Sequence, residues 1–468
     1  MDLERKAKIK GIKRTYEGEE VDFGHSSVHD WRGGDGPNEA LRSSKSKASD
    51  PNQAVYVGGM RHPARVVRTM ATAQSLGVRI RAAWNFFVDK HQEVEEMAEN
   101  YGGSTAALPS ELVEEWKETL KRIVGAENTE DQTAVKLVSK FEYKSGLDAE
   151  LVEGWIRKVN DPDWAIPIWI RQGVPLGIHS PIQCCGIFPP SEETSPELAA
   201  EDSASFLSRG ELINYASVEQ NKQLAEEEIE RYASKGYVAK TSKEEVGEMF
   251  QHTTVSKLAL ILKQKEDGSV KKRIVIDLRR SLGNAKAVLP ERLILPRPQD
   301  CVEMVRDQYA VSSKGQGEDP SELWGCEFIL IDVTDAFMSF GVERKEWGHC
   351  LAPGTKPDEM LLFTALLFGF KTAPLLYSRL AALLSRWLQS IVPPGIAAHQ
   401  TYLDDALWFL QGPLKVRNRC LGLILFTMEA IGLRIAYSKG HRAGSVQWIG
   451  VTYLLETGSQ SFKPAKWD

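Results

Sequence analysis

The sequence of 468 residues has no long apolar run, and its six cysteines form no C-x-x-C pair. Its longest apolar stretch, near 361–370, is far shorter than the ~20 residues that a membrane-spanning helix needs. Cysteines without regular spacing favour reduced thiols over a disulfide framework or a zinc site. The opening residues lack the apolar core of a secretory signal. We therefore expect an intracellular protein, cytoplasmic or nuclear, that is not secreted and has no membrane partner.

The overall composition is that of an ordinary globular chain, with 42% hydrophobic and 26% charged residues. This excludes collagen-like, mucin-like and wholly disordered proteins, and the length predicts several domains. The net charge of -6 is unevenly distributed, because residues 251–468 carry 27 Lys and Arg against 22 Asp and Glu. A basic second half is compatible with a polyanionic partner.

The first half divides into a polar arm at 1–55 and a mainly helical region at 56–205, which ends in a Pro-, Ser- and Glu-rich linker. Helical spacing of apolar residues follows Ser110, and Thr129–Gln132 has the pattern of a capping box. Six tryptophans lie before residue 200, which predicts a hydrophobic core belonging to this half alone. No motif indicates the role of the helical region.

The next segment predicts a helix followed by a hairpin. Ser217–Gln220 has a capping-box pattern, and Gly236 is placed to stop its helix after Lys235. Two β-like runs, 257–263 and 273–278, flank an Asp-Gly turn. Five basic residues gather there, which suits phosphate contact, although a solvated strand edge has the same composition.

Two later segments place aspartates beside apolar residues. The apolar residues 328–331 lead into Asp332, which predicts a buried strand with a carboxylate at its end. Asp404 and Asp405 lie between apolar flanks, which predicts a tight hairpin with acids at its tip. Each segment alone is also compatible with an exposed turn, because Asp favours turns.

Buried carboxylates need a cation nearby, or their pKa rises. No Lys or Arg lies within several residues of either segment, and oxygen ligands favour Mg²⁺ or Mn²⁺ over zinc. Carboxylates from two strand ends can hold two metal ions ~3.5–4 Å apart, an arrangement that serves phosphate chemistry.

Seven segments then follow one another in a recognisable order. They are 265–279, Leu295–Pro298, Asp332–Phe337, Leu367–Pro374, Tyr402–Asp405 (YLDD), Gly432–Lys439 and Val446–Gly450. Together they resemble the reverse transcriptase fingers and palm of LTR retrotransposons, most closely the gypsy-type Pol polyprotein. The resemblance implies an α+β fold: a polymerase palm with a small antiparallel sheet backed by helices, a fingers hairpin, and the mainly helical region before them. It places the fingers at 206–300, the palm at 301–460 and a truncated thumb stub at 461–468.

The resemblance also implies roles for single residues. The catalytic carboxylates would be Asp332, Asp404 and Asp405, which would bind two Mg²⁺ ions together with the backbone carbonyl of Val333. Lys439 would donate a proton to the departing pyrophosphate.

The incoming nucleotide and the primer would have their own contacts. Nucleotide-binding residues would be Lys265, Arg273, Asp335, Ala336, Phe337 and Gly369, where Asp335 and Ala336 act through backbone N–H groups. Phe337 would exclude a 2′-hydroxyl, and Trp448 and Gly450 would hold the primer end.

Plainer interpretations exist for several of these residues. Phe337 and Trp448 are also typical core aromatics, and Gly369 could serve a turn alone. Lys439 suits a helix C-terminus, and Arg273 suits an exposed strand.

The leading hypothesis is an RNA-directed DNA polymerase that acts on an RNA or DNA template-primer with dNTPs. The alternative is a catalytically silent, retroelement-derived protein that binds nucleic acid or another partner. A palm polymerase that makes RNA is a third possibility, which Phe337 disfavours. Nothing in the sequence indicates an oligomeric state.

Overall fold

The computed structural model describes residues 54–57, 60–126, 143, 145–192, 213–264, 268, 270–312, 324–455 and 462–464. The chain forms two compact units that divide after His62. The described part of the first unit contains β1 (Ala54–Val57) and β2 (Met60–Pro63) up to His62, and the two strands pair in a two-stranded sheet. Most of the predicted polar arm, the predicted linker from 193 onward and the capping box at Thr129 lie outside the described residues.

A four-stranded antiparallel sheet organises the second unit, with strand order β11-β6-β10-β9. Its strands are β6 (Trp324–Asp332), β9 (Ala397–Tyr402), β10 (Asp405–Pro413) and β11 (His441–Ala443). The two central strands are apolar on both faces. Ile329 and Trp408 enter one core, whereas Phe328 and Phe409 enter another. Burial on both faces explains why the sequence shows continuous apolar runs here instead of alternation.

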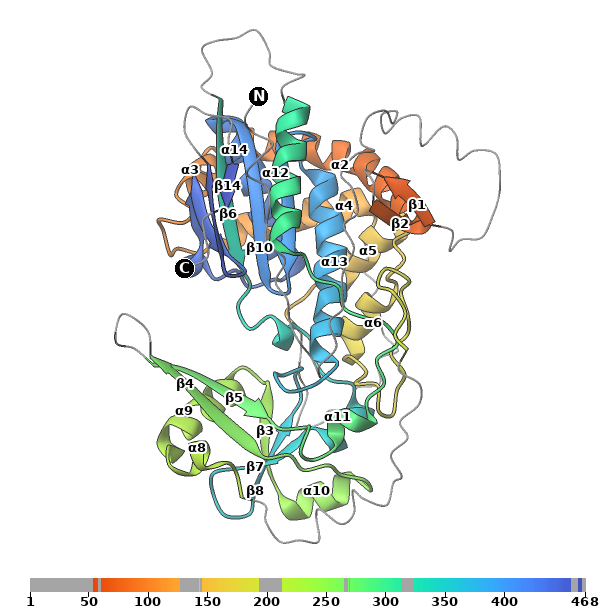
Figure 1. The fold of residues 1–468 in the computed structure, drawn as a ribbon, viewed down its shortest axis with the longest axis vertical. Coiled ribbons are helices and arrows are strands. Elements are labelled where there is room, and N and C mark those ends of the chain that lie inside the picture. The colour runs from red at the N-terminus through yellow and green to blue at the C-terminus, as the bar shows by residue number, and fades with distance from the viewer. Residues whose placement is uncertain are drawn as a thin grey trace, which may run out of the picture. The chain divides into compact units, whose positions relative to one another are not determined.

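Helices cover one face of this sheet (Figure 1). α13 (Ala373–Ile391) and α14 (Leu414–Ile431) belong to that core, and helices from the first half of the chain pack on them. Those helices are α2 (Ala64–Lys90), α3 (Glu93–Glu99), α4 (Ser110–Val124), α5 (Ala149–Val159) and α6 (Ala165–Gln172). The helix predicted from Ser110 is therefore present as α4.

The predicted separate core of the first half is wrong, because four of its tryptophans, Trp84, Trp116, Trp155 and Trp169, lie in the same core as α13 and α14. The ring of Trp84 lies 5.5 Å from Phe426, and Trp155 stacks on Trp387 at 5.1 Å. The indole N–H of Trp84 donates to the carbonyl of Arg419. The helical region and the central sheet thus share one apolar interior.

The other face of the sheet packs on a second, smaller core. It is closed by α12 (Pro298–Ser312) and by the antiparallel sheet β12-β13-β14. These strands are β12 (Ser445–Trp448), β13 (Val451–Leu455) and β14 (Phe462–Pro464).

The described residues of 213–300, together with two strands from 351–363, form the predicted hairpin and its surroundings. β4 (Leu258–Gln264) and β5 (Val270–Ile276) pair antiparallel, and Gly268 in their turn has a φ of +79°. A second sheet has the order β3-β8-β7. Its strands are β3 (Val238–Ser242), β7 (Leu351–Pro353) and β8 (Glu359–Phe363).

The helix predicted from Ser217 is interrupted. It forms α8 (Ala216–Glu219) and α9 (Lys222–Ser234), and Gly236 follows with a φ of +74°. The predicted capping box at Ser217 is wrong, because its hydroxyl accepts from the backbone N–H of Leu260 instead. α10 (Lys243–Met249) has a capping box, from Ser242 and Glu245, and α11 (Gly283–Lys286) is a single turn.

These elements confirm the predicted α+β class, with helices and small antiparallel sheets of two to four strands in the described residues. In the same part of the chain, no helix is long and apolar enough to cross a membrane.

Candidate active site

The three predicted carboxylates come together at one end of the central sheet. Asp332 is the last residue of β6, Asp405 is the first of β10, and the two are direct partners in the antiparallel register. Asp404 precedes Asp405 in the turn after β9, where Leu403 has a φ of +54°. Opposed residues of antiparallel strands have Cα atoms ~4.5–5.5 Å apart. The register therefore brings two of the carboxylates side by side, with the third next to them.

The electrostatics of the site show that these acids are crowded. Burial raises the pKa of Asp405 to about 6, and the negative charges of Asp404 and Asp332 add to the shift. Burial and the charge of Asp332 also raise the pKa of Asp404, against the opposite effect of Lys439 and Arg273. Burial and the neighbouring carboxylates therefore both disfavour the ionised forms of Asp404 and Asp405.

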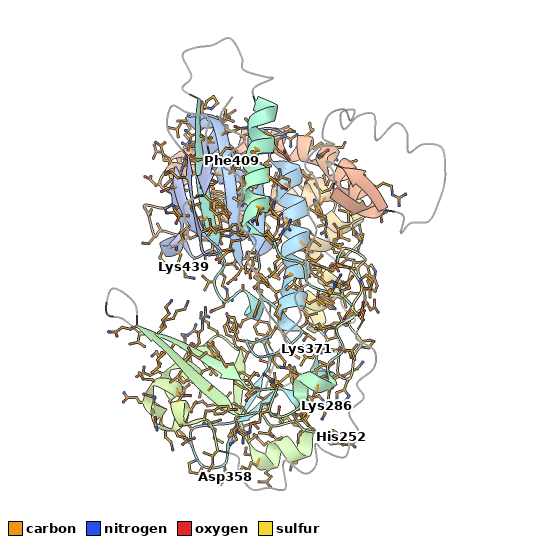
Figure 2. The ribbon with its side chains drawn as sticks, viewed as in Figure 1. His252, Lys286, Asp358, Lys371, Phe409 and Lys439 are labelled. Atoms are coloured by element: carbon orange, nitrogen blue, oxygen red, sulfur yellow. The ribbon has the colours of Figure 1, made fainter. Side chains whose placement is uncertain are left out.

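Lys439 is the nearest counter-ion of Asp332. It ends the short 3₁₀ helix Tyr437–Lys439, and its Nζ lies 2.5 Å from Oδ1 of Asp332. Figure 2 shows Lys439 at the end of the central sheet. Its side chain is 54% exposed, whereas that of Asp332 is 16% exposed. Among the described residues, no group of three or more His, Cys, Asp or Glu side chains is placed to enclose a metal ion.

Backbone hydrogen bonds fix the segment that follows Asp332. The carbonyl of Asp332 accepts from the N–H of Ala436, and Thr334 donates to the carbonyl of Arg434. Val333 forms an isolated antiparallel bridge with Ile435, and its side chain is buried. The chain from 332 to 334 is thus held against the segment that leads to Lys439.

The β4–β5 hairpin directs basic residues at the carboxylates. Arg273 lowers the pKa of Asp404, and Lys271 lowers that of Asp405, so both charges reach the acids. The guanidinium carbon of Arg273 lies 5.2 Å from the ring centroid of Phe368. Lys263 pairs with Lys271 across the hairpin. Lys265 lies outside the described residues.

Phe337 lies in an aromatic cluster beside the carboxylates. It opens the 3₁₀ helix Phe337–Ser339, is 8% exposed, and contacts Phe368 and Tyr377 at 5.0 and 5.7 Å between ring centroids. The hydroxyl pKa of Tyr377 is raised by burial and then by all three aspartates, which places Tyr377 next to them. Sequence reasoning missed Tyr377 and Phe368, because both stand in ordinary apolar runs.

Asp335 and Ala336 connect this cluster to α9. Asp335 has a φ of +51°, and its carboxylate accepts from Lys235 at 2.5 Å and from Tyr237 at 3.2 Å. Although burial opposes ionisation, these partners hold the pKa of Asp335 below its usual value. Ala336 is buried. The side chain of Asp335 thus ties the segment after β6 to α9.

Gly369 packs closely against the backbone of Ile276 at the end of β5. Its φ is +114°, and a β-carbon added there would lie 2.1 Å from the carbonyl oxygen of Ile276. Its own carbonyl accepts from the side-chain amide of Asn284. The end of β5 thus explains why glycine is needed here, and the expected contact of Gly369 with template and nucleotide stays a prediction.

Trp448 and Gly450 differ in exposure. Trp448 is 2% exposed in the second core, and its expected role in holding the primer end stays a prediction. Gly450 lies in the turn between β12 and β13, with a φ of +79° and no atom within 4 Å of an added β-carbon. The turn, and not the indole ring, is the accessible part of this segment.

Comparison with known proteins gives weak similarities only. No protein-family model matches the chain, and no curated protein matches it in sequence. A foamy viral protease-reverse transcriptase in complex with dsDNA matches at 16% identity over 52% of this chain and 41% of that chain, with a TM-score of 0.33. The native prototype foamy virus protease-reverse transcriptase matches at 16% identity over 62% of this chain and 31% of that chain, with a TM-score of 0.36. The chain thus covers less than half of either protein, and its function must rest on the site itself.

Proposed function

We propose that this chain is an RNA-directed DNA polymerase, the reverse transcriptase of a gypsy-type LTR retrotransposon and part of its Pol polyprotein. The observation that carries the proposal is the register pair of Asp332 and Asp405, with Asp404 beside them and basic hairpin residues whose charges act on Asp404 and Asp405. Such a site suits attack of a primer 3′-hydroxyl on the α-phosphate of a dNTP.

The donor chemistry of the site fits a divalent cation. Burial and the neighbouring carboxylates raise the pKa of Asp404 and Asp405, so a cation bound there would favour their ionised forms. Asp332, Asp404 and Asp405 would hold the ions together with the carbonyl of Val333. Bound there, two Mg²⁺ ions, or Mn²⁺, would lower the pKa of the primer hydroxyl and neutralise charge on the phosphates.

The chain's own residues would bind and orient the nucleotide. Arg273 and Lys265 would contact the triphosphate from the hairpin. The backbone N–H groups of Asp335 and Ala336 would contact it from the segment that follows β6. Phe337, fixed by its aromatic neighbours, would lie under the sugar and exclude a 2′-hydroxyl. The exposed ammonium of Lys439 would hold the proton that the departing pyrophosphate takes up.

A second candidate is a catalytically silent protein that binds nucleic acid. The ion pair of Lys439 with Asp332 favours it, because the ammonium stands where a cation is needed.

Primer extension separates the two. The assay offers RNA and DNA templates with dNTPs or rNTPs and Mg²⁺ or Mn²⁺, and it compares the native chain with Asp404→Asn. The control is Asp358→Asn, an identical change at a position whose side chain is 83% exposed and paired with Lys243. Asn also accepts the left-handed backbone found at Asp358.

We expect dNTP incorporation that Asp404→Asn abolishes and Asp358→Asn leaves intact. No incorporation by any variant, combined with equal binding of a template-primer by all three, would establish the silent protein instead.

A further inference from the structure

A tyrosine from the helical region reaches the strand that ends in Asp332. Tyr101 lies in the turn after α3, where it forms an isolated bridge with Ser104, and it is 4% exposed. Its hydroxyl donates to the carbonyl oxygen of Leu330 at 2.9 Å. Leu330 is two residues before Asp332 on β6. The hydrogen bond therefore holds the strand backbone close to the Asp332 carboxylate.

The same ring also packs against the segment that carries Lys439. A β-carbon on Gly440, the next residue, would lie 2.8 Å from Cζ of Tyr101 and 3.0 Å from its hydroxyl oxygen. The ring of Tyr437 meets that of Tyr101 edge-on at 6.1 Å. Tyr101 therefore lies between β6 and the short helix 437–439, the two elements that supply the Asp332–Lys439 pair.

Further contacts anchor the tyrosine from behind. Arg442 of β11 donates to the carbonyl of Ala98 at 2.6 Å, and Gly102 packs directly on the backbone of Arg442. Burial, together with the charge of Asp332, raises the hydroxyl pKa of Tyr101, so the hydroxyl remains a donor throughout the neutral pH range. The side chain of Tyr101 is thus held in place by its neighbours, and its hydroxyl stays protonated.

We propose that Tyr101 is a positioning residue for the nucleotidyl-transfer site, which makes the helical region a working part of that site. This inference rests on the proposed polymerase function. Tyr101 touches no substrate; it acts through the backbone of Leu330 and through Gly440. Loss of its hydroxyl should slow the chemical step more than it weakens dNTP binding, because small displacements of reacting groups affect the rate steeply.

The test compares Tyr101→Phe with Tyr453→Phe. Tyr453 is equally buried and also donates to a backbone carbonyl, that of Pro298, but it lies in the second core. Single-nucleotide incorporation gives kcat and the KM for dNTP, and urea unfolding gives the stability of each variant. Hydrogen–deuterium exchange of peptides covering 327–335 and 436–443 reports the local effect without any need for activity.

We expect Tyr101→Phe to lower kcat about ten-fold with a KM changed less than two-fold. Exchange should become faster in both peptides, and Tyr453→Phe should change neither property at a similar loss of stability. Equal behaviour of the two variants, or a loss of activity without faster exchange, would overturn the proposal.

Two safeguards keep the result readable. If Tyr101→Phe does not fold, Gly440→Ala pushes on the same contact from the other side and should speed exchange in the same peptides. If the native chain incorporates no nucleotide, the proposed function fails, and exchange alone then decides whether Tyr101 holds β6 and the 437–439 segment.

Discussion

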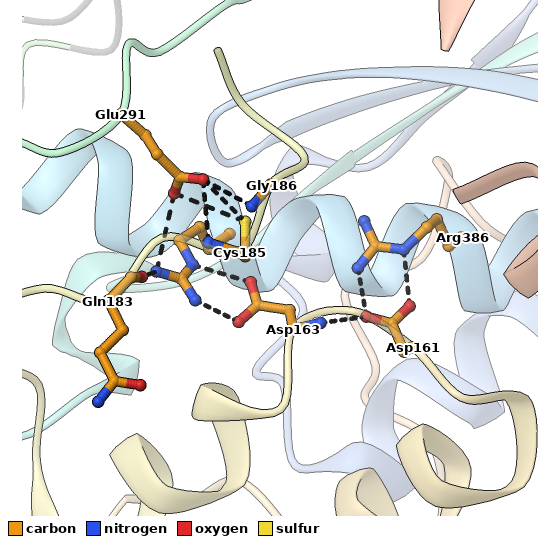
Figure 3. Close-up of polar contacts among 8 residues, drawn as sticks. Asp161, Asp163, Gln183, Cys185, Gly186, Glu291 and Arg386 are labelled. Carbon is orange, nitrogen blue, oxygen red and sulfur yellow. Dashed lines mark hydrogen bonds and ion pairs between the residues drawn. The ribbon is translucent and has the colours of Figure 1, made fainter. Parts of the chain in front are cut away.

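Arg379 and Asp163 form a bidentate ion pair in the interior of the protein. The Nε and Nη2 atoms of Arg379 lie 2.8 and 2.5 Å from the two carboxylate oxygens, and both side chains are at most 1% exposed. Arg386, two turns along α13, makes a similar pair with Asp161 (Figure 3). The loop between α5 and α6 is thereby fastened to a helix that lies more than 200 residues away in the sequence, since the partners are 216 and 225 residues apart.

Removal of one partner of this pair should be strongly destabilising. Asp163→Ala leaves the guanidinium buried without its carboxylate, which typically costs ~3–5 kcal/mol in the free energy of unfolding. Urea unfolding measures this, with Glu153→Ala as a control because its partners Arg157 and Arg171 are 64% and 35% exposed. Exposed pairs contribute only ~0–1 kcal/mol. Equal losses for both variants would contradict the prediction.

Stability should depend on pH through His349. The ring is 3% exposed, with Nδ1 2.8 Å from the hydroxyl of Thr254 and Nε2 2.8 Å from Nε2 of His179. Burial, then the charges of His179 and Lys286, lowers its pKa to about 3. The unfolded chain, with an ordinary pKa of ~6.5, binds a proton between these values that the folded chain does not. Stability is therefore present above pH ~6.5 and lost as the pH falls toward 3, by up to ~1.4 kcal/mol per unit.

His349→Gln should reduce this slope when unfolding is measured between pH 7 and 4. Part of the slope will remain, because burial also lowers the pKa of His399, to about 4, and the double variant with His399→Gln should be flatter still. An unchanged slope in both variants would mean that neither imidazole resists protonation.

Gly369→Ala should damage the link between the 367–374 segment and the hairpin. The new methyl group would clash with the carbonyl of Ile276, and the alanine backbone would have to keep a positive φ. We therefore expect a loss in the free energy of unfolding well above the ~1 kcal/mol of a simple left-handed position. Gly268→Ala is the matched control, because Gly268 also has a positive φ but open space around it. Thermal unfolding compares the two, and the prediction fails if they are equally stable.

Phe337→Val should weaken the selection of deoxynucleotides. On the proposed function, removal of the ring would open room under the sugar, and we expect the ratio of kcat/KM for dNTP to that for rNTP to fall about ten-fold or more. Phe340→Val is the control, because Phe340 is fully buried and packs on Trp169. If both variants keep the native ratio, another residue selects the sugar.

Local patterns allowed the strands that carry Asp332, Asp404 and Asp405 to be predicted. The apolar run into Asp332 and the paired acids at 404–405 each encode a strand end within a few residues, and the structure places them in one register. The β4–β5 hairpin could be predicted equally well, because apolar runs and an Asp-Gly turn are short-range sequence signals.

Contacts between distant segments could not be predicted in the same way. The core of the helical region is completed by residues such as Phe426 and Trp387, and no periodicity in the first half indicates those partners. The pairing of Lys439 with Asp332 spans 107 residues. Likewise, no pattern in the sequence around Tyr101 predicts its contacts with Leu330 and Gly440.

The shared core has a consequence for how the protein is made. The indole N–H of Trp84 can form its hydrogen bond only after Arg419, 335 residues later, has been synthesised. At ~5–20 residues per second, a ribosome needs roughly 20 to 70 s to deliver that partner. During this interval the nascent helices carry uncovered tryptophans, so chaperones that shield apolar surface should bind this chain early in its synthesis and leave it after α14 emerges.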